Sequence, residues 1–464
     1  VCGPILDQVP MGEGYYYFDK YHSKFISDGG FKSTIWQYDN LARITFQVII
    51  PIFGENIELY SLAQMAIMIL VYLAFYLTLA KITNNNFFAF STTLIFIANY
   101  TGSFSMMATG NNQRFVQRVP NLIPLLVSFY YLNRYFNSNK LKDLLISTAL
   151  FVLGVYLAHH GIFMLPLFII FIIIKNLINI NLKSKKYSLL MIPLFMLSSW
   201  ILTKYDHLAP KEGIISFLVN TQDLTQKTLL QIPNLIIPDE IVKNIAQKWI
   251  APPIFYPFTK VLIWFEILIF ILLIFTIFQV KKRSITQILF LVSVIALPIV
   301  CLLNLYAYGS GAPDPLHNLG EDRIYFIPSI FTSIVLGTYI YMLQKNKNMF
   351  LKATSIVILI IYILYNSSLI RNGVEISKPT SQKMELFISY VKQKTLDRNS
   401  KITIIGPSHL MWPNQFTDHF YNTNNNLEIL LDSSDWKNGI TKSNSRRIVL
   451  IDFKGDKITE KIIK

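Results

Sequence analysis

Residues 57–80 read IELYSLAQMAIMILVYLAFYLTLA, and this run decides the class of the protein. Glu58 is its one charged residue. A helix rises about 1.5 Å per residue, so about 20 apolar residues cross a hydrocarbon layer about 30 Å thick. A helix also satisfies its backbone hydrogen bonds within its own segment, which lipid requires. The run therefore predicts a transmembrane helix.

Similar apolar runs recur along the whole chain, which is 52% hydrophobic and only 15% charged. Each is roughly 18–24 residues long, the length that a spanning helix needs. Together they predict an all-α polytopic membrane protein with about ten transmembrane helices. The further predicted spans are 86–103, 119–136, 141–159, 161–179, 187–204, 259–280, 285–306, 324–343 and 350–370.

The connections between these spans alternate in charge. One alternating set carries 14 lysines and arginines, whereas the short connections of the other set carry 3, namely Arg114, Arg118 and Arg323. Basic residues concentrate in cytoplasmic loops, so the first set is predicted to face the cytoplasm. The net charge of +15 is then a signal of topology, and it predicts no nucleic-acid partner. The 14 residues are Lys81, Arg134, Lys140, Lys142, Lys175, Lys183, Lys185, Lys186, Lys281, Lys282, Arg283, Lys345, Lys347 and Lys352.

Three longer segments fall on the outside by the same count: 1–56, 205–258 and 371–464. We expect three regions: an outer loop over 1–56, a helix bundle over 57–370, and a small extracytoplasmic α/β domain over 371–464. An outer first loop also predicts a further transmembrane helix before Val1. The plasma (inner) membrane is the expected location.

Local patterns suggest structure within the second and third of these segments. Segment 205–258 contains amphipathic stretches at 212–230 and 238–250, which fit helices lying in the membrane interface. They could gate a lateral opening or simply cap the bundle. In the last segment, 381–396 is predicted as a helix and 402–405 and 448–453 as strands, while 422–446 could be a loop.

The first segment combines acids with a dense group of tyrosines. Asp7, Glu13 and Asp19 lie among them, and Glu13 occurs in Glu13-Gly14-Tyr15-Tyr16. A carboxylate whose pKa is raised by burial can take a proton from a hydroxyl group. The three acids are thus candidate general bases, although a solvated loop explains the same composition.

Basic and histidine residues are expected on the same outer face. The loop 307–323 contains GSGAPDPLHNLGEDR at 309–323, and its Arg323 could clamp a phosphate or anchor a lipid headgroup beside Glu321 or Asp322. Arg114 and Arg118 belong to another outer loop. His159 and His160 end a span, where packing is the alternative explanation. Glu266 lies inside a predicted span, where an acid is costly enough to suggest a function, although its side chain could equally snorkel to the interface or pair with Lys260.

This layout resembles the GT-C membrane glycosyltransferases, among them the protein O-mannosyltransferases and aminoarabinose transferases. The resemblance covers the architecture of nearly the whole chain, with loose motifs. It implies a catalytic acid in the first outer loop, matched here by Glu13 or Asp7. The chain lacks the adjacent acid pair of many members, so Asp19 stays a candidate as well. The late-loop pattern of some members is similar to His317, Glu321, Asp322, Arg323 and Tyr325.

The resemblance implies transfer of a sugar from a polyprenyl-phosphate donor to a glycan, lipid or protein acceptor. An acid would deprotonate the acceptor, while Arg323, Arg114, Arg118 and His317 would bind the donor phosphate. Glu321, Asp322, Tyr325, His159 and His160 would support them. No cofactor is expected, although some members use a divalent metal. A lipid-linked oligosaccharide flippase, polymerase or ligase is the alternative, and a non-catalytic assembly protein a third class.

Overall fold

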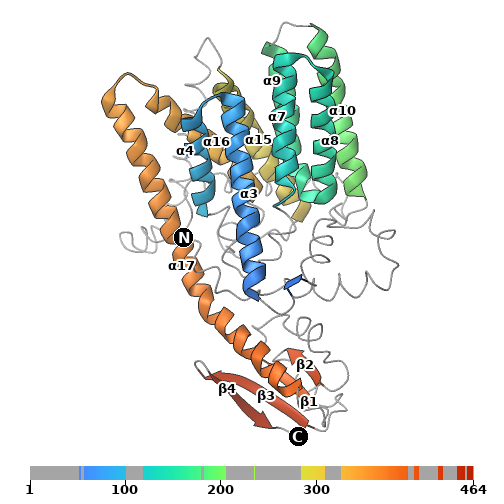
Figure 1. Cartoon of the computed structure of the whole chain (residues 1–464), viewed down its shortest axis with the longest axis vertical. Helices are drawn as coiled ribbons and strands as arrows, with labels where there is room; N and C mark the ends of the chain where they lie inside the picture. The colour runs from blue at the N-terminus through green and yellow to red at the C-terminus, as the bar shows by residue number, and fades with distance from the viewer. Residues whose placement is uncertain are drawn as a thin grey trace, which may run out of the picture. The chain divides into compact units, whose positions relative to one another are not determined.

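The protein is described by a computed structural model. It describes residues 52–53, 57–100, 119–178, 182–204, 235, 284–308, 326–395, 402–406, 427–431, 447–454 and 457–462. These residues are mostly helical (Figure 1). The helices are α3 (Ile57–Thr83), α4 (Asn86–Ala98), α7 (Leu122–Ser138), α8 (Leu141–Leu157), the 3-10 helix η3 (His159–Met164), α9 (Leu165–Ile178), α10 (Leu182–Lys204), α15 (Ile285–Tyr308), α16 (Phe326–Gln344) and α17 (Met349–Thr395).

Four helical stretches of the described chain are long and apolar enough to cross a membrane: Met65–Thr83, Gly161–Ile178, Phe326–Gln344 and Met349–Asn372. Shorter apolar helical stretches cover Asn86–Ala98, Tyr187–Ser198 and Ile285–Cys301. The chain is thus a membrane protein by the length and composition of its helices. The predicted count of ten spans stays a prediction, and 259–280 lies outside the described residues.

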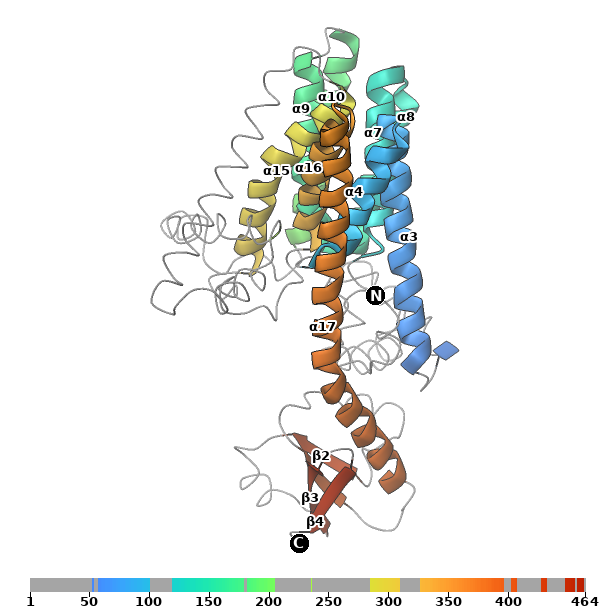
Figure 2. The same ribbon diagram turned by 90° about the vertical axis from the view of Figure 1, so that its left-hand side faces the viewer.

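The chain divides into two compact units, with boundaries inside α3, between Met68 and Ile69, and inside α17, between Leu369 and Ile370. In the unit that contains α4 to α16, helix α15 packs against both α16 and α9. On one side α16 contacts α4, and on the other α10 contacts both α8 and α9 while α7 pairs with α8 (Figures 1 and 2). α15 therefore joins two groups of helices.

Phenylalanine rings fill the space within the two groups. Around α4, the ring of Phe96 lies 5.1 Å from that of Phe75 and 5.3 Å from that of Phe326. In the other group, the ring of Phe151 lies 4.9 Å from that of Phe168 and 4.4 Å from that of Phe195. All six rings are almost completely buried. Ring packing of this kind adds to the dispersion contacts that hold helices together where lipid replaces water.

Close approach between α4 and α16 depends on Gly337. A Cβ atom at this position would lie 2.8 Å from Cβ and 3.0 Å from Cα of Thr92, which is fully buried. Gly154 in α8 plays the same part against α7, because its Cβ would lie 2.8 Å from Cδ2 of Leu125. Small residues at such crossings allow helix backbones to approach each other in membranes.

The basic turns lie together at one end of the helices. The connections α3–α4, α7–α8 and α16–α17, together with the end of α9 and the start of α10, form the upper edge of the larger unit in Figure 1. Lys81 and Lys175 are in the last turns of their helices, and Lys345 begins the α16–α17 turn. We call this edge the basic end.

Helix α17 is longer than expected. The predicted span 350–370 and the predicted separate helix 381–396 belong to one helix of 47 residues. At about 1.5 Å per residue it measures about 70 Å. The polar composition after residue 371 therefore does not end the helix.

The other unit contains a four-stranded sheet in the order β2-β1-β3-β4. β1 (Ile402–Gly406) runs parallel to β2 (Leu427–Leu431) and β3 (Arg447–Lys454), while β3 pairs antiparallel with β4 (Lys457–Ile462). Strands β1 and β3 match the two predicted strands. β2 lies in the stretch that could be a loop, and β4 was not expected. That residues 371–464 form a separate extracytoplasmic domain stays a prediction.

Candidate functional site

Most of the predicted site lies outside the described residues. This holds for the candidate bases Asp7, Glu13 and Asp19, and also for Glu266. It holds equally for the predicted phosphate-binding and supporting residues Arg114, Arg118, His317, Glu321, Asp322, Arg323 and Tyr325. The backbones of His159 and His160 are described, and they form the start of η3.

The structure does place the points from which these segments leave the bundle. Segment 101–118 starts after Tyr100 and ends before Val119, and segment 309–325 lies between α15 and α16. The end of α4, the start of α7, η3, the end of α15 and the start of α16 all lie opposite the basic end (Figures 1 and 2). The attachment points of these two segments and of the histidine turn are therefore on one side of the bundle.

Turn η3 is held against the start of α7 by a buried asparagine. Asn121 Nδ2 donates to the Ala158 carbonyl oxygen at 3.3 Å, and the same oxygen accepts from the Gly161 N–H at 2.9 Å. Asn121 is fully buried. A Cβ at Gly161 would lie 3.1 Å from the Val155 Cα, so the turn packs tightly on the end of α8. This packing fixes the backbone that carries His159.

A second buried polar group joins three parts of the chain, and we call it the polar junction. It comprises Asn99, Tyr100, Leu235, Tyr362 and Asn366. Asn99 Nδ2 donates to the Leu235 carbonyl oxygen at 2.8 Å and to the Tyr362 hydroxyl at 3.0 Å. The Tyr100 N–H donates to Asn366 Oδ1 at 3.2 Å, and Asn366 Nδ2 donates to the Tyr362 carbonyl oxygen at 3.0 Å. The side chains of Asn99 and Asn366 are almost fully buried, as is Leu235.

The polar junction was not predicted from the sequence. Its signal was nevertheless present, because Asn99 and Asn366 are amides within predicted spans. Polar side chains at membrane depth are costly unless they find partners. The junction contains neither an acidic nor a basic side chain. Its role is therefore to hold these three parts of the chain together.

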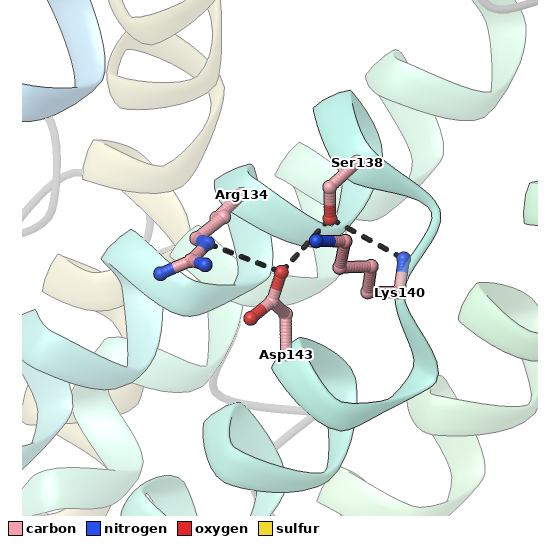
Figure 3. Close-up of polar contacts among 4 residues, drawn as sticks. All are labelled: Arg134, Ser138, Lys140 and Asp143. Atoms are coloured by element: carbon pink, nitrogen blue, oxygen red, sulfur yellow. Dashed lines mark hydrogen bonds and ion pairs between the residues drawn. The ribbon is translucent and has the colours of Figure 1, made fainter.

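An ion pair lies at the basic end, in the turn between α7 and α8. Figure 3 shows the guanidinium of Arg134 and the hydroxyl of Ser138 both directed at the carboxylate of Asp143. Arg134 Nε lies 3.3 Å from Asp143 Oδ2, and Ser138 Oγ donates to the same oxygen at 2.8 Å. The Asp143 side chain is 4% exposed and that of Arg134 is 47% exposed. The Lys140 backbone N–H donates to Ser138 Oγ at 3.3 Å, so the cluster closes the helical hairpin.

Further polar contacts join α9 to α10. Asn176 Nδ2 donates to Ser188 Oγ at 3.0 Å, and the serine hydroxyl lies 3.1 Å from Asn176 Oδ1. Both side chains are buried. Within the described part of the chain, no three histidine, cysteine, aspartate or glutamate residues gather as a metal site would require. The described polar groups thus serve packing between helices.

Comparison of the sequence with models of known protein families gives no match. Comparison with curated proteins gives no significant match.

Proposed function

We propose that this chain is a membrane glycosyltransferase of the GT-C type. It transfers a sugar from a polyprenyl-phosphate donor to an acceptor on the outer face of the plasma (inner) membrane. One observation supports the proposal above the others. The basic turns lie at one end of the helices, and the segments with the candidate arginines and histidines leave the bundle from the opposite end.

The topology follows from the rule that basic loops stay in the cytoplasm. The basic end then faces the cytoplasm, and about ten helices span the membrane. Residues 1–56, 205–258 and 371–464 are extracytoplasmic, the last as a small α/β domain. A donor with its tail in the bilayer and its phosphate at the outer surface would meet Arg114, Arg118, His317 and Arg323 there.

The proposed reaction replaces the bond between the anomeric carbon and the phosphate oxygen by a bond to the acceptor oxygen, and the acceptor's proton passes to a carboxylate. Glu13 or Asp7, with Asp19 as the third candidate, removes a proton from the acceptor hydroxyl. The hydroxyl oxygen attacks the anomeric carbon, and the bond from that carbon to the phosphate oxygen breaks. Arg323, helped by Arg114 or Arg118, stabilises the negative charge on the departing polyprenyl phosphate. Glu321, Asp322, Tyr325, His159 and His160 support these groups, and the reaction proposed needs no bound cofactor.

The test uses the full chain in vesicles that contain radiolabelled polyprenyl-phosphate sugars. Asp7→Asn, Glu13→Gln and Asp19→Asn are compared for release of polyprenyl phosphate. Loss of the general base lowers kcat by about 10²–10⁴, and loss of the phosphate clamp in Arg323→Ala lowers it by about 10²–10³. Full activity in all four variants would refute the proposal. A parallel assay with a chelator tests for a divalent metal.

The alternative is a lipid-linked oligosaccharide flippase, polymerase or ligase. A flippase moves the labelled lipid across the vesicle membrane intact, so no polyprenyl phosphate appears. A polymerase or ligase releases the carrier only when a second glycan is supplied. Glu266 is the residue within a predicted span that a flippase would use, and Glu266→Gln would then stop transport.

A further inference from the structure

Arg134 carries more hydrogen-bond donors than the α7–α8 hairpin uses. Its Nε pairs with Asp143 Oδ2 at 3.3 Å, and in Figure 3 a terminal nitrogen of the guanidinium points away from that carboxylate. A guanidinium has five N–H donors in a planar fork, so the contact with Asp143 leaves others for a second acceptor. The Arg134 side chain is 47% exposed, so a partner from outside the protein can reach it.

The hairpin also holds this guanidinium in one orientation. Its central carbon lies 5.9 Å from the centre of the Tyr131 ring, which is the distance of a cation–π contact. Asp143 is itself fixed, because it is almost fully buried and accepts from the Ser138 hydroxyl at 2.8 Å. A group that is oriented before binding loses less conformational freedom when a ligand arrives.

The α7–α8 turn, taken as residues 131–145, has a positive charge that its own carboxylate does not balance. It contains three basic residues, Arg134, Lys140 and Lys142, and one acid, Asp143, which leaves a net charge of +2. Both lysines are exposed, and in Figure 3 the Lys140 side chain extends back toward Asp143. A guanidinium with ammonium groups beside it suits the oxygens of a phosphate.

The faces that carry these cations point away from the core of the bundle. On α7, Phe136 packs on Phe171 of α9, and Arg134 comes two residues earlier, which is about 200° round the helix. On α8, Lys142 and Leu145 share one face because they are three residues apart. Leu145 is 62% exposed and lies one turn further from the basic end. The turn therefore offers a charged headgroup and an apolar chain adjacent positions.

We propose that the α7–α8 turn is a binding site for an anionic glycerophospholipid. The terminal nitrogens of Arg134 donate to the lipid phosphate, Lys140 and Lys142 balance its charge, and an acyl chain lies along Leu145. A soluble anion has no group to place beside that leucine, so the apolar face favours a lipid. The site needs no sugar transfer, and its test is independent of the proposed function.

The test measures which lipid lies beside residue 145. Leu145→Cys, in a Cys2→Ser background, is labelled with a bimane fluorophore and placed in vesicles, while the buried Cys301 thiol stays unlabelled. The vesicles mix phosphatidylcholine with phosphatidylglycerol, and one of the two lipids carries bromine atoms on its acyl chains. Bromine quenches a fluorophore only on contact. The dependence of quenching on composition therefore gives the ratio of the two association constants at this site.

The two lipids have the same phosphodiester, but phosphatidylcholine adds a cationic ammonium group that Lys140 and Lys142 repel. A basic residue near a membrane surface contributes about fivefold in affinity for an anionic lipid. We expect the unmodified turn to prefer phosphatidylglycerol by at least about fivefold. A ratio near one would overturn the proposal.

Arg134→Gln separates this site from the general charge of the basic end, and it should lower the ratio about fivefold. The matched control is Lys345→Gln, which removes another cation over a ring at the same end. The Lys345 ammonium lies 6.0 Å from the centre of the Tyr341 ring. The control should change the ratio by less than about twofold, because this lysine belongs to a different turn. Equal falls in the two variants would assign the preference to diffuse attraction and overturn the site.

Arg134→Lys keeps a positive charge beside Asp143, so it tests the site even where the glutamine variant does not fold. An ammonium is a point charge without a planar fork, so the ratio should fall at least about threefold. An unchanged ratio would show that the guanidinium does not hold the phosphate. Inorganic phosphate at about 10 mM should leave the ratio of the unmodified turn within about twofold, because it has no acyl chain to bury. Loss of the preference would mean that free phosphate occupies the site and would overturn the lipid assignment.

Discussion

Replacing Gly337 by alanine tests whether α4 and α16 are packed as closely as the structure indicates. The added Cβ would lie 2.8 Å from Cβ and 3.0 Å from Cα of Thr92. The second of these atoms belongs to the backbone, so a change of rotamer at Thr92 cannot relieve the contact. The helices must separate locally instead.

Two opposing terms set the size of the effect. Overpacking a close contact costs about 1–3 kcal/mol, whereas alanine favours a helix over glycine by about 1 kcal/mol. The contact includes a backbone atom, so the first term lies in the upper part of its range, at about 2–3 kcal/mol. We therefore expect a net loss of about 1–2 kcal/mol in the free energy of unfolding. At about 2–4 °C per kcal/mol, the melting temperature falls by about 2–8 °C.

The buried thiol of Cys301 provides the assay in a Cys2→Ser background, since it reacts with a fluorogenic maleimide only when the bundle opens. Leu364→Ala, at a position that is 66% exposed, should melt within about 1–2 °C of the parent. The double variant Thr92→Gly/Gly337→Ala moves the small residue across the contact and should recover part of the loss. If Gly337→Ala melts at or above the parent temperature, the close packing of α4 on α16 is wrong.

Three further predictions concern the turns at the basic end. Asp143→Asn should lower the free energy of unfolding by about 1 kcal/mol or less, because the partner Arg134 is half exposed. Asp143→Ala also removes the acceptor for the Ser138 hydroxyl, so it should lower the free energy of unfolding by about 1–3 kcal/mol. Equal melting of both variants and the parent would contradict this. Asn139 has a φ of 56°, in the left-handed region. Asn139→Ala should therefore lower the free energy of unfolding by about 1–2 kcal/mol, while Asn139→Gly should leave it almost unchanged. A glycine variant less stable than the alanine variant would exclude the left-handed turn. In a Cys2→Ser background, Asn346→Cys should react with an impermeant maleimide in inside-out vesicles and not in intact cells. The opposite pattern would mean that the basic end faces outward.

Hydropathy predicted where helices occur better than where they end. The predicted span 57–80 corresponds to α3, 119–136 to α7 and 324–343 to α16, each within a few residues. Apolar length is a local property, so it can be read from a single stretch of sequence. The end of α17 was missed, because a change from apolar to polar residues marks where a chain leaves lipid and not where its helix stops.

Hydropathy could not predict that α4 ends early. The predicted span ran to residue 103, but the helix ends at Ala98. The partners of Asn99 are 136 and 263 positions away in the sequence, so no local pattern announces them. The proposed catalytic and phosphate-binding residues lie outside the described residues and stay predictions.

The contact between α4 and α16 also has a consequence for synthesis. Helices α7 to α10 follow one another in the chain and can pack as soon as they are made. Helix α4 waits for α16, more than 220 residues later, which at about 5–20 residues per second is about 10–45 s of translation. During that interval the face of α4 that carries Thr92 has no α16 surface to pack against. The earliest part of the bundle to be translated is therefore among the last to be completed.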